Sequence, residues 1–358
     1  MANRFWVGNG GNWSDNTNHW AASSGGAPGA SLPTSADNVY FDALSFSLGS
    51  QTVTVGADAN CLDMDWTGAT NSPTLAGTFA IYIYGSANFT GLGTLSHTGQ
   101  HRYNATATGK TITTAGLARN GTTYFEGTGG GWTFQDAFES GAWVYSSGNV
   151  NTNGKTVIIN GNLYLSYAGV RIFTLGSSIV NLVGNWDYSS GTNLTLVANT
   201  ATIKITGLGA FHGGGITTYN EVQLNDTSHT ISGSNTFARL SFNPSGAQTI
   251  TWTDITTQTV GVMKRTGTGV ITFAGSGIGG WNVTKSNLSR VSLRNMSISR
   301  STASPVNIFY AGQTSTNGGN NTAWIFANAI ITSMLGSSIA LGKKKTRYIP
   351  NLGRVVRS

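Results

Sequence analysis

Short phrases with a central Thr-Val or Thr-Ile pair recur along this chain of 358 residues, between turns rich in glycine and asparagine. Each phrase is a β-branched run that favours a strand, and no apolar period of helix length separates one phrase from the next. A chain made of many such runs is typical of stacked β-coils, so we expect an elongated scaffold. The phrases stand at residues 51–54, 110–113, 155–158, 229–232, 248–251 and 258–261.

Composition is consistent with a folded solenoid. Glycine, at 49 residues, is about twice as frequent as usual, and charged residues make up only 9% of the chain. Aromatic residues are plentiful, with 10 Trp, 12 Tyr and 15 Phe, which is enough apolar mass for a continuous core. Because a solenoid grows along one axis, the whole length can form a single domain.

We predict an all-β fold, an elongated parallel β-helix (β-solenoid), over a run of antiparallel hairpins. The similar phrases at residues 109–112 and 154–157 would stack in register as neighbouring coils and pair Thr with Thr. The spacing between phrases is irregular, so the sequence defines no strict period. Further strand candidates are residues 79–84, 156–159, 163–165, 179–182, 194–197, 202–205, 222–224 and 270–273.

The two ends of the chain differ from its middle. Residues 1–50 are expected to form an aromatic N-terminal cap and an entering strand, because a solenoid must cover the open end of its core. Trp6, Trp13 and Trp20 lie there among Gly and Asn, and a sugar-binding aromatic platform is the alternative interpretation. Residues 51–327 are the predicted β-solenoid, and residues 328–358 are an apolar, then basic, C-terminal docking tail.

Charge is unevenly placed. Residues 1–254 carry all 13 acidic residues and 8 basic ones, a net 8 − 13 = −5, whereas residues 255–358 carry 12 basic residues and no acidic one, which together give the total of +7. A cationic tail of this kind can lie along the sheet edge or in an acidic groove of a partner. The residues expected to dock are Lys343, Lys344, Lys345, Arg347, Tyr348, Arg354 and Arg357.

Two other interpretations of the tail are less favoured. Phosphate contacts by the same basic run would indicate nucleic-acid binding, but a solvated tail explains the run as well. An apolar window of about 19 residues from Ala323, followed by three lysines, has the order of a membrane span. Polar residues such as Asn328 and Ser333 dilute that window, so we favour a docking segment.

Catalytic chemistry is weakly represented. Polysaccharide hydrolysis on a β-helix needs carboxylates that converge across adjacent coils, and the best set is Glu126, Asp136 and Glu139. With so few acids over such a length, scattered surface carboxylates explain the pattern better. We therefore expect a protein that is not an enzyme, with hydrolysis left open.

No cofactor or metal site is predicted. Of the five histidines, only His97 and His101 have a spacing that ligands use, and their context is strand and turn, so we expect both to face solvent. Nucleotide-binding glycine loops and nucleophile elbows are absent from the sequence. Cys61, the only cysteine, excludes an intramolecular disulfide and is expected to be a small buried side chain. The N-terminus shows no secretory signal pattern.

Three passages carry a resemblance to a known family. They are residues 4–13 with 33–39, residues 60–69, and residues 310–313 with 318–321 and 324–326. Together they resemble a family of glycine-rich β-repeat proteins from tailed phages and environmental viral genomes, which look like virion surface or tail-fibre components. The likeness covers about residues 4–327 and carries no catalytic motif.

The resemblance implies a bacteriophage virion protein used for attachment or decoration. We expect a structural, tail fibre- or spike-like protein, or one displayed on the particle surface, that binds receptor glycans of the host and docks through its tail on another virion protein. Assembly into a homotrimer is left open. Capsid decoration without a receptor role and a polysaccharide depolymerase are the alternatives. The expected location is the virion, after assembly in the host cytoplasm.

Overall fold

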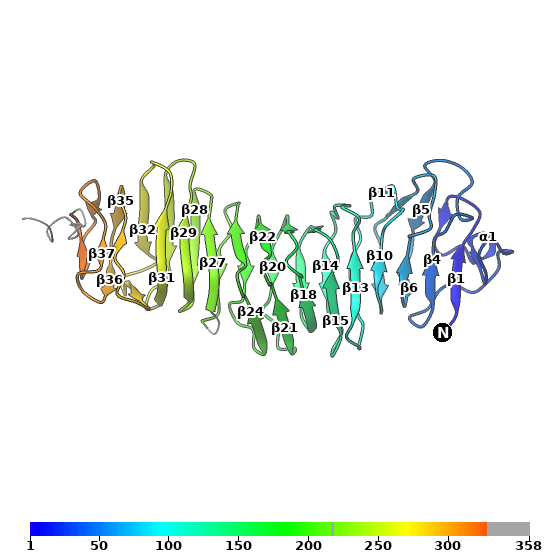
Figure 1. Cartoon of the computed structure of the whole chain (residues 1–358), viewed down its shortest axis with the longest axis horizontal. Helices are drawn as coiled ribbons and strands as arrows, with labels where there is room; N and C mark the ends of the chain where they lie inside the picture. Colours follow the sequence, from blue (N-terminus) through cyan, green and yellow to red (C-terminus); the bar gives the residue numbers. More distant parts are fainter. Residues whose placement is uncertain (216–217, 328–358) are drawn as a thin grey trace, which may run out of the picture.

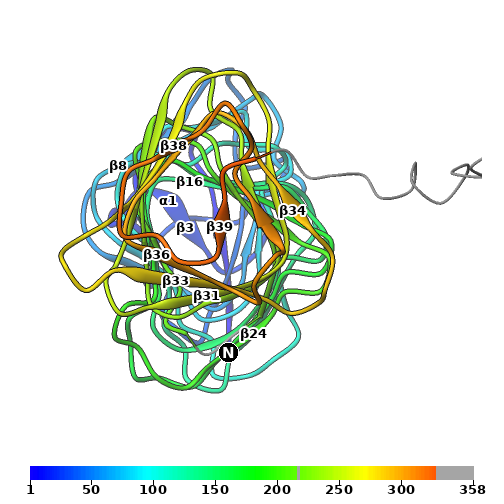
Figure 2. The same ribbon diagram turned by 90° about the vertical axis from the view of Figure 1, so that its left-hand side faces the viewer.

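The computed structural model describes residues 1–215 and 218–327 and is a parallel β-solenoid. Figure 1 shows an elongated rod in which the chain winds from the N-terminal end, in blue, to residue 327. Figure 2 looks along this rod and shows the coils superposed around a common interior. The only helix in the described ranges is α1 (Asn16–His19), so the fold class predicted from the sequence is confirmed.

One parallel sheet runs along nearly the whole rod and receives one strand from each coil. This sheet, called sheet C, has thirteen strands. Its strands are β6 (Ala59–Cys61), β9 (Ile81–Ile83), β12 (His101–Tyr103), β14 (Thr123–Phe125), β17 (Trp143–Tyr145), β20 (Leu163–Tyr164), β23 (Trp186–Asp187), β26 (Phe211–His212), β28 (Ser228–Ser232), β30 (Gln248–Trp252), β32 (Ile271–Gly275), β35 (Met296–Ile298) and β38 (Thr316–Asn317).

A second sheet, sheet A, covers another face of the N-terminal half. All its pairings are parallel except that of β3 with β1 at the N-terminal edge. Its ten strands are β3 (Trp20–Ala21), β1 (Asn3–Trp6), β4 (Asn38–Tyr40), β7 (Met64–Asp65), β10 (Ala87–Asn88), β13 (Lys110–Thr113), β15 (Gly131–Phe134), β18 (Gly148–Asn151), β21 (Arg171–Thr174) and β24 (Leu194–Val197).

The third face is formed by sheet B and, further along, by sheet D. Sheet B contains β2 (Gly11–Asn12), β5 (Thr52–Val55), β8 (Thr74–Gly77) and β11 (Thr94–Leu95). Sheet D contains β16 (Phe138–Ser140), β19 (Val157–Ile159), β22 (Ile179–Leu182), β25 (Thr202–Ile205), β27 (Thr218–Leu224), β29 (Thr236–Phe242), β31 (Thr257–Arg265), β33 (Trp281–Lys285) and β36 (Ser301–Ser304).

The cross-section changes after β26, because two faces merge into single long strands. The C-terminal half of β27 pairs with β25, whereas β33 pairs with the N-terminal half of β31. The long strands bend where the register between β29 and β31 skips Ala238 and Gly261. Beyond them a third face reappears as sheet E, with β34 (Val291–Ser292), β37 (Phe309–Tyr310) and β39 (Trp324–Ile325).

The core is one apolar column that extends from Trp6 to Trp324. Strand residues alternate between the interior and the outside, as in β5, where Val53 and Val55 are buried and Thr52 and Thr54 are partly exposed. All ten tryptophans are buried, and aromatic rings of successive coils stack, as with Trp252 and Trp281 at 4.3 Å. Removal of this apolar surface from water stabilises the stacked coils.

Most strand positions agree with the sequence prediction. The predicted stacking of residues 109–112 on residues 154–157 in neighbouring coils is wrong. Residues 110–113 form β13 in sheet A, whereas residues 157–159 form β19 in sheet D, so the two phrases do not stack. The Thr pair that does form is Thr111 with Thr133, one coil further. Alternation identifies the outward residue of a strand but not the face of the coil to which the strand belongs.

Candidate functional site

Glu126, the first catalytic candidate, forms an ion pair on the outer surface. Its two carboxylate oxygens accept hydrogen bonds from Nε (2.7 Å) and Nη2 (2.9 Å) of Arg102. The guanidinium of Arg102 also lies 4.3 Å from the ring centre of Tyr124 and 5.4 Å from that of Tyr82. The carboxylate therefore holds Arg102 in place between two tyrosines, beside sheet C.

The other two carboxylates stabilise turns and strands at different places on the coil. Asp136, between sheets A and D, accepts hydrogen bonds from the amides of Thr114 (2.8 Å) and Ala115 (2.6 Å). Glu139, in β16, accepts one from the side-chain amide of Asn160 (3.0 Å). Since each group is bonded within its own part of the surface, the three carboxylates do not form the convergent set that hydrolysis requires.

The tryptophans proposed as a sugar platform are inside the protein, which corrects that alternative. Trp6 and Trp20 have no exposed surface and Trp13 is 3% exposed. Trp20 packs edge-on against both Trp6 (5.1 Å) and Trp13 (5.0 Å). No ring face is free to contact a glycan, because the rings pack against one another and against Phe41. Their role as a cap stays a prediction.

The two histidines expected at the surface are in the core, and this expectation was wrong. His97 is 1% and His101 0% exposed, with ring centres 5.0 Å apart. His97 donates through Nε2 to the carbonyl of Phe79 (2.9 Å), while neither ring nitrogen of His101 has a hydrogen-bond partner among the described residues. Burial and the nearby Arg119 lower the pKa of His97 to about 4, and burial holds the pKa of His101 well below its usual value.

Arg119 shares this interior, and no carboxylate of the described ranges pairs with it. Its guanidinium donates to the carbonyls of Gly99 (2.8 Å) and Thr122 (3.2 Å) and to the hydroxyl of Thr123 (3.1 Å). Burial lowers the pKa of Arg119 to about 10. Across residues 1–215 and 218–327, no group of three or more His, Cys, Asp or Glu side chains could hold a metal ion.

An Asp, a His and a Ser do come into line on sheet C, but they lack the contacts of a catalytic triad. Asp187, His212 and Ser232 occupy successive coils, and His212 Nδ1 lies 2.5 Å from Ser232 Oγ. Asp187 instead accepts hydrogen bonds from Ser189 (2.8 Å) and Ser166 (3.2 Å). A triad needs its acid to orient the imidazole, so we assign this set no catalytic role.

The outer face of sheet C carries a row of tyrosines that the sequence analysis did not identify. Parallel register places Tyr82, Arg102, Tyr124, Val144 and Tyr164 one after another along the rod. The tyrosines are half-buried and stand two coils apart, so about 10 Å separates one from the next. The hydroxyl of Tyr164 accepts a hydrogen bond from Asn162 (2.8 Å). We call Tyr82, Tyr124 and Tyr164 the tyrosine row.

A signal for this row was present in the sequence. Each tyrosine lies between two inward-facing residues, as in Ile81-Tyr82-Ile83 and Leu163-Tyr164-Leu165, which marks it as outward-facing. The tyrosines are 42 and 40 residues apart in the sequence, so only the register of the coils brings them together. The tyrosine row offers amphipathic groups of the kind that bind sugars, with apolar rings and hydroxyls.

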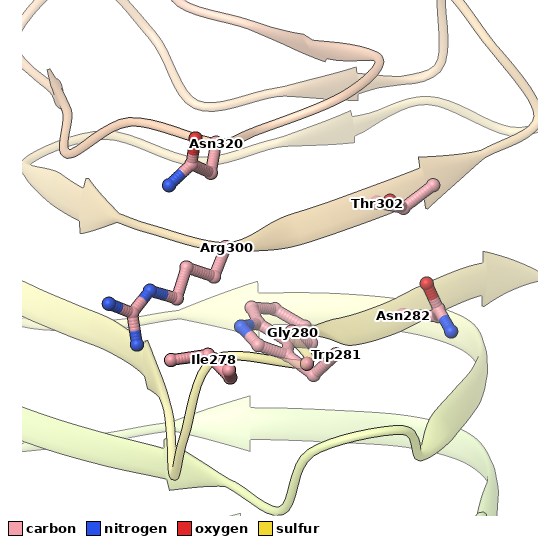
Figure 3. Close-up of a pocket in the computed structure, with 8 residues that line it drawn as sticks. Ile278, Gly280, Trp281, Asn282, Arg300, Thr302 and Asn320 are labelled. Carbon is pink, nitrogen blue, oxygen red and sulfur yellow. The ribbon is translucent and has the colours of Figure 1, made fainter.

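Near the C-terminal end of the rod, a pocket of about 240 Å³ is lined by residues of three successive coils. Figure 3 shows Arg300, Asn320 and Ile278 gathered at one end, and Asn282 and Thr302 on neighbouring strands at the other. Asn282 in β33 and Thr302 in β36 are register partners, and buried Trp281 contributes to the lining. We call this cavity the Arg300 pocket.

A smaller cavity of about 150 Å³ lies on the outer face of sheet A. Its lining includes Gly131, Asn149 and Ile172. Its lining contains no charged residue. Of these two cavities, the Arg300 pocket is therefore the one with a charged group that can bind a ligand.

The docking residues Lys343, Lys344, Lys345, Arg347, Tyr348, Arg354 and Arg357 lie outside the described residues. Most of the apolar window from Ala323 to residue 341 lies there as well. In the two ranges that are described, no helix has the length and apolar character needed to cross a membrane. Comparisons with protein-family models, curated proteins and solved structures find no match.

Proposed function

We propose that the protein is a non-enzymatic structural protein of a bacteriophage virion, a tail fibre- or spike-like or surface-displayed rod that binds glycans of the host surface. The continuous sheet C carries this proposal, because thirteen parallel strands make a rigid body that can hold a binding face away from its attachment point. The connection to a virion rests on the resemblance of the terminal motifs.

Glycan binding is supported by the tyrosine row. Its rings and hydroxyls lie on the outer face of sheet C at intervals of about 10 Å, so an extended chain of sugars that lies along the rod can contact more than one tyrosine. Arg102 and Glu126 neutralise each other between Tyr82 and Tyr124, so this part of the face carries no net charge. A neutral, extended glycan that lies along the rod is the ligand this row fits best.

Anchoring is supported by the distribution of charge. Residues 255–358 carry 12 basic residues and no acidic one, and six of the basic residues fall in the last 16 positions. A segment of this charge is suited to an acidic surface of another virion protein. In this arrangement one end of the rod attaches to the particle, and the tyrosine row, in the N-terminal half, is free to meet the host.

The attachment role is tested with labelled, purified protein and host cells. We expect the protein to bind the cells, soluble host polysaccharide to compete, and Tyr124→Ala with Tyr164→Ala to reduce binding at least tenfold. Gln223→Ala, on the outer face of sheet D, serves as the control. Undiminished adsorption by virions that lack the protein would remove the receptor-binding part of the proposal.

The anchoring role has its own test. Deletion of residues 343–358 should release the protein from the particle without loss of cell binding by the purified chain. Incorporation at the normal level would contradict an anchoring role for this tail. A protein that decorates the capsid without a receptor role would be incorporated but would not bind cells. Release of reducing sugar from host polysaccharide, lost in Asp136→Asn, would instead establish a depolymerase.

A further inference from the structure

Two exposed isoleucines lie near the Arg300 pocket, Ile278 in the loop between β32 and β33 and Ile255 in the connection between β30 and β31 of the preceding coil. Ile278 is 93% and Ile255 84% exposed. A side chain on Gly279 would begin 3.1 Å from Cγ1 of Ile255, so both isoleucines border the same loop. Ile255 also has a left-handed backbone with φ of 60°, which is a genuine outlier for a β-branched residue. We call Ile255 and Ile278 the isoleucine lip.

Two polar residues of the pocket have the same unusual backbone. Arg300 and Asn320 both have φ of 56°. Asn adopts this region readily, whereas Arg does so at a cost in free energy, and strain of that kind is found at functional sites. Arg300 donates through Nη1 to the carbonyl of Gly277 (2.5 Å), and its Nε and Nη2 have no hydrogen-bond partner among the described residues. Nε and Nη2 of Arg300 are thus available to donate hydrogen bonds to a ligand.

The carboxylate of Asp254 holds the loop between β32 and β33 in place and does not contact Arg300 directly. Its carboxylate accepts hydrogen bonds from the amides of Gly277 (2.9 Å) and Gly279 (2.7 Å), which lower the pKa of Asp254. Arg300 is close enough to contribute to the lowered pKa, but the two side chains form no ion pair. The pocket is therefore preformed, since the loop that borders it is tied down before any ligand arrives.

Apart from Asp254, whose carboxylate is bonded to amides of the bordering loop, the charged residues of the coils that form the pocket are basic. Residues 255–327 contain no Asp or Glu, so every formal charge there is positive. An anionic ligand is attracted to such a surface, and a cationic one is repelled. The basic residues of this region are Lys264, Arg265, Lys285, Arg290, Arg294 and Arg300.

We propose that the Arg300 pocket binds a single sugar residue that carries a carboxylate, as a uronic acid does. The carboxylate accepts hydrogen bonds from Nε and Nη2 of Arg300, a geometry that guanidinium groups favour. Asn282, Thr302 and Asn320 bind the sugar hydroxyls, while the C–H face of the ring packs on Ile278. A pocket of about 240 Å³ is small for a larger ligand, which limits the occupant to one sugar.

This proposal rests on glycan binding as the protein's function and adds a second contact of different charge. The tyrosine row fits a neutral stretch of chain, and the Arg300 pocket fits an acidic unit. A host polysaccharide with uronic acid residues could engage both. The pocket can also be tested alone, because the binding of one sugar does not involve the tyrosine row.

The test measures binding of methyl β-D-glucuronide and methyl β-D-glucoside to the full chain by ligand-observed NMR. These probes differ only in the carboxylate. We expect the glucuronide to bind at least tenfold more tightly than the glucoside. Arg300→Gln should reduce glucuronide binding at least tenfold, whereas Arg239→Gln, an exposed arginine of β29 outside the pocket, should leave it unchanged. Asn320→Gly, which keeps the backbone geometry and removes the amide, should weaken binding of both probes.

Equal binding of the two probes, or glucuronide binding that survives Arg300→Gln, would overturn the proposal. Circular dichroism of each variant separates loss of the site from loss of the fold. If the glucuronide does not bind but the protein still adsorbs to host cells, only the pocket assignment fails. If neither occurs, glycan binding as the function fails as well.

Discussion

Arg171 is fully buried and has no carboxylate partner in the described part of the chain, so backbone carbonyls satisfy its charge. Its Nε donates to Gly169 (2.9 Å) and its Nη1 to Tyr145 (3.2 Å), while Nη2 donates to Tyr167 and Thr192, both at 2.5 Å. These carbonyls belong to adjacent coils, which Arg171 therefore joins from the inside. Buried carbonyls without a donor are costly.

Replacement of this arginine should destabilise the rod. We expect Arg171→Met to lower the free energy of unfolding by about 3 kcal/mol, because several carbonyls lose a charged donor at once. Chemical denaturation followed by tryptophan fluorescence measures the change. The control, Arg239→Met, alters an exposed side chain and should stay within about 0.5 kcal/mol of the parent. Equal effects of the two substitutions would show that Arg171 does not join the coils.

The buried histidines predict a pH dependence. Both have pKa values below the unfolded value of 6.5, so the folded state favours their neutral form. Their contribution to stability is fully present above pH 6.5 and is lost as the pH falls below 6.5, for His97 down to about pH 4, by roughly 1.4 kcal/mol per pH unit for each histidine. His101→Phe, which removes no hydrogen bond, should reduce this slope and leave stability at pH 8 nearly unchanged. A slope identical to that of the parent would contradict the assignment.

Ile255 is a position where the backbone conformation costs stability. Its side chain is exposed and its backbone is left-handed, a conformation that Asn tolerates better than a β-branched residue. We expect Ile255→Asn to raise the free energy of unfolding by about 1 kcal/mol, since strain is relieved and little packing is lost. Denaturation of the purified variant checks this. A loss of stability would indicate that Ile255 packs more tightly than its exposure shows.

At the scale of elements, the long strands of sheet D depend on close approach between backbones. A side chain on Gly261 in β31 would begin 2.6 Å from the carbonyl oxygen of Ala238 in β29. The glycine therefore lets the two strands stay paired at the point where both bend. By contrast, a side chain on Gly246 would meet nothing within 4 Å.

This pair of glycines provides a matched comparison. Gly261→Ala should lower the unfolding free energy by about 1–3 kcal/mol, because the new methyl group forces two strands apart. Gly246→Ala should be neutral or stabilise by up to about 1 kcal/mol, since alanine restricts the unfolded chain. Thermal unfolding of both variants gives the comparison. Similar melting temperatures would mean that the bend does not need a glycine.

Sequence reasoning predicted strands better than it predicted their arrangement. β22 and β24 lie where β-branched and apolar runs placed them, because alternation identifies a half-buried strand. The coils vary in length, with 20 residues between Ile81 and His101 and 25 between Trp186 and Phe211. Because the number of residues per coil varies, the sequence does not show which residues lie side by side on neighbouring coils. The tyrosine row was missed for this reason. The left-handed backbone of Arg300 has no signal in the sequence.

The whole molecule is a rod whose surface chemistry differs along its length. The N-terminal half presents the tyrosine row, the last described coils form the cationic Arg300 pocket, and the strongest positive charge follows at the end of the chain. Because each coil contacts mainly its neighbours, such a rod gains or loses stability locally. The binding faces should therefore respond to substitution independently of each other.

Distances between spin labels on sheet C test the stacked rod most directly. In a Cys61→Ala background, cysteines replace Asn60 and either Val144, four coils away, or Ser232, eight coils away. With about 4.8 Å per coil, pulsed electron paramagnetic resonance should give separations near 19 and 38 Å, adjusted for label length. A separation that doubles as the number of coils doubles is the predicted result. Two similar distances would show a compact fold and contradict the account.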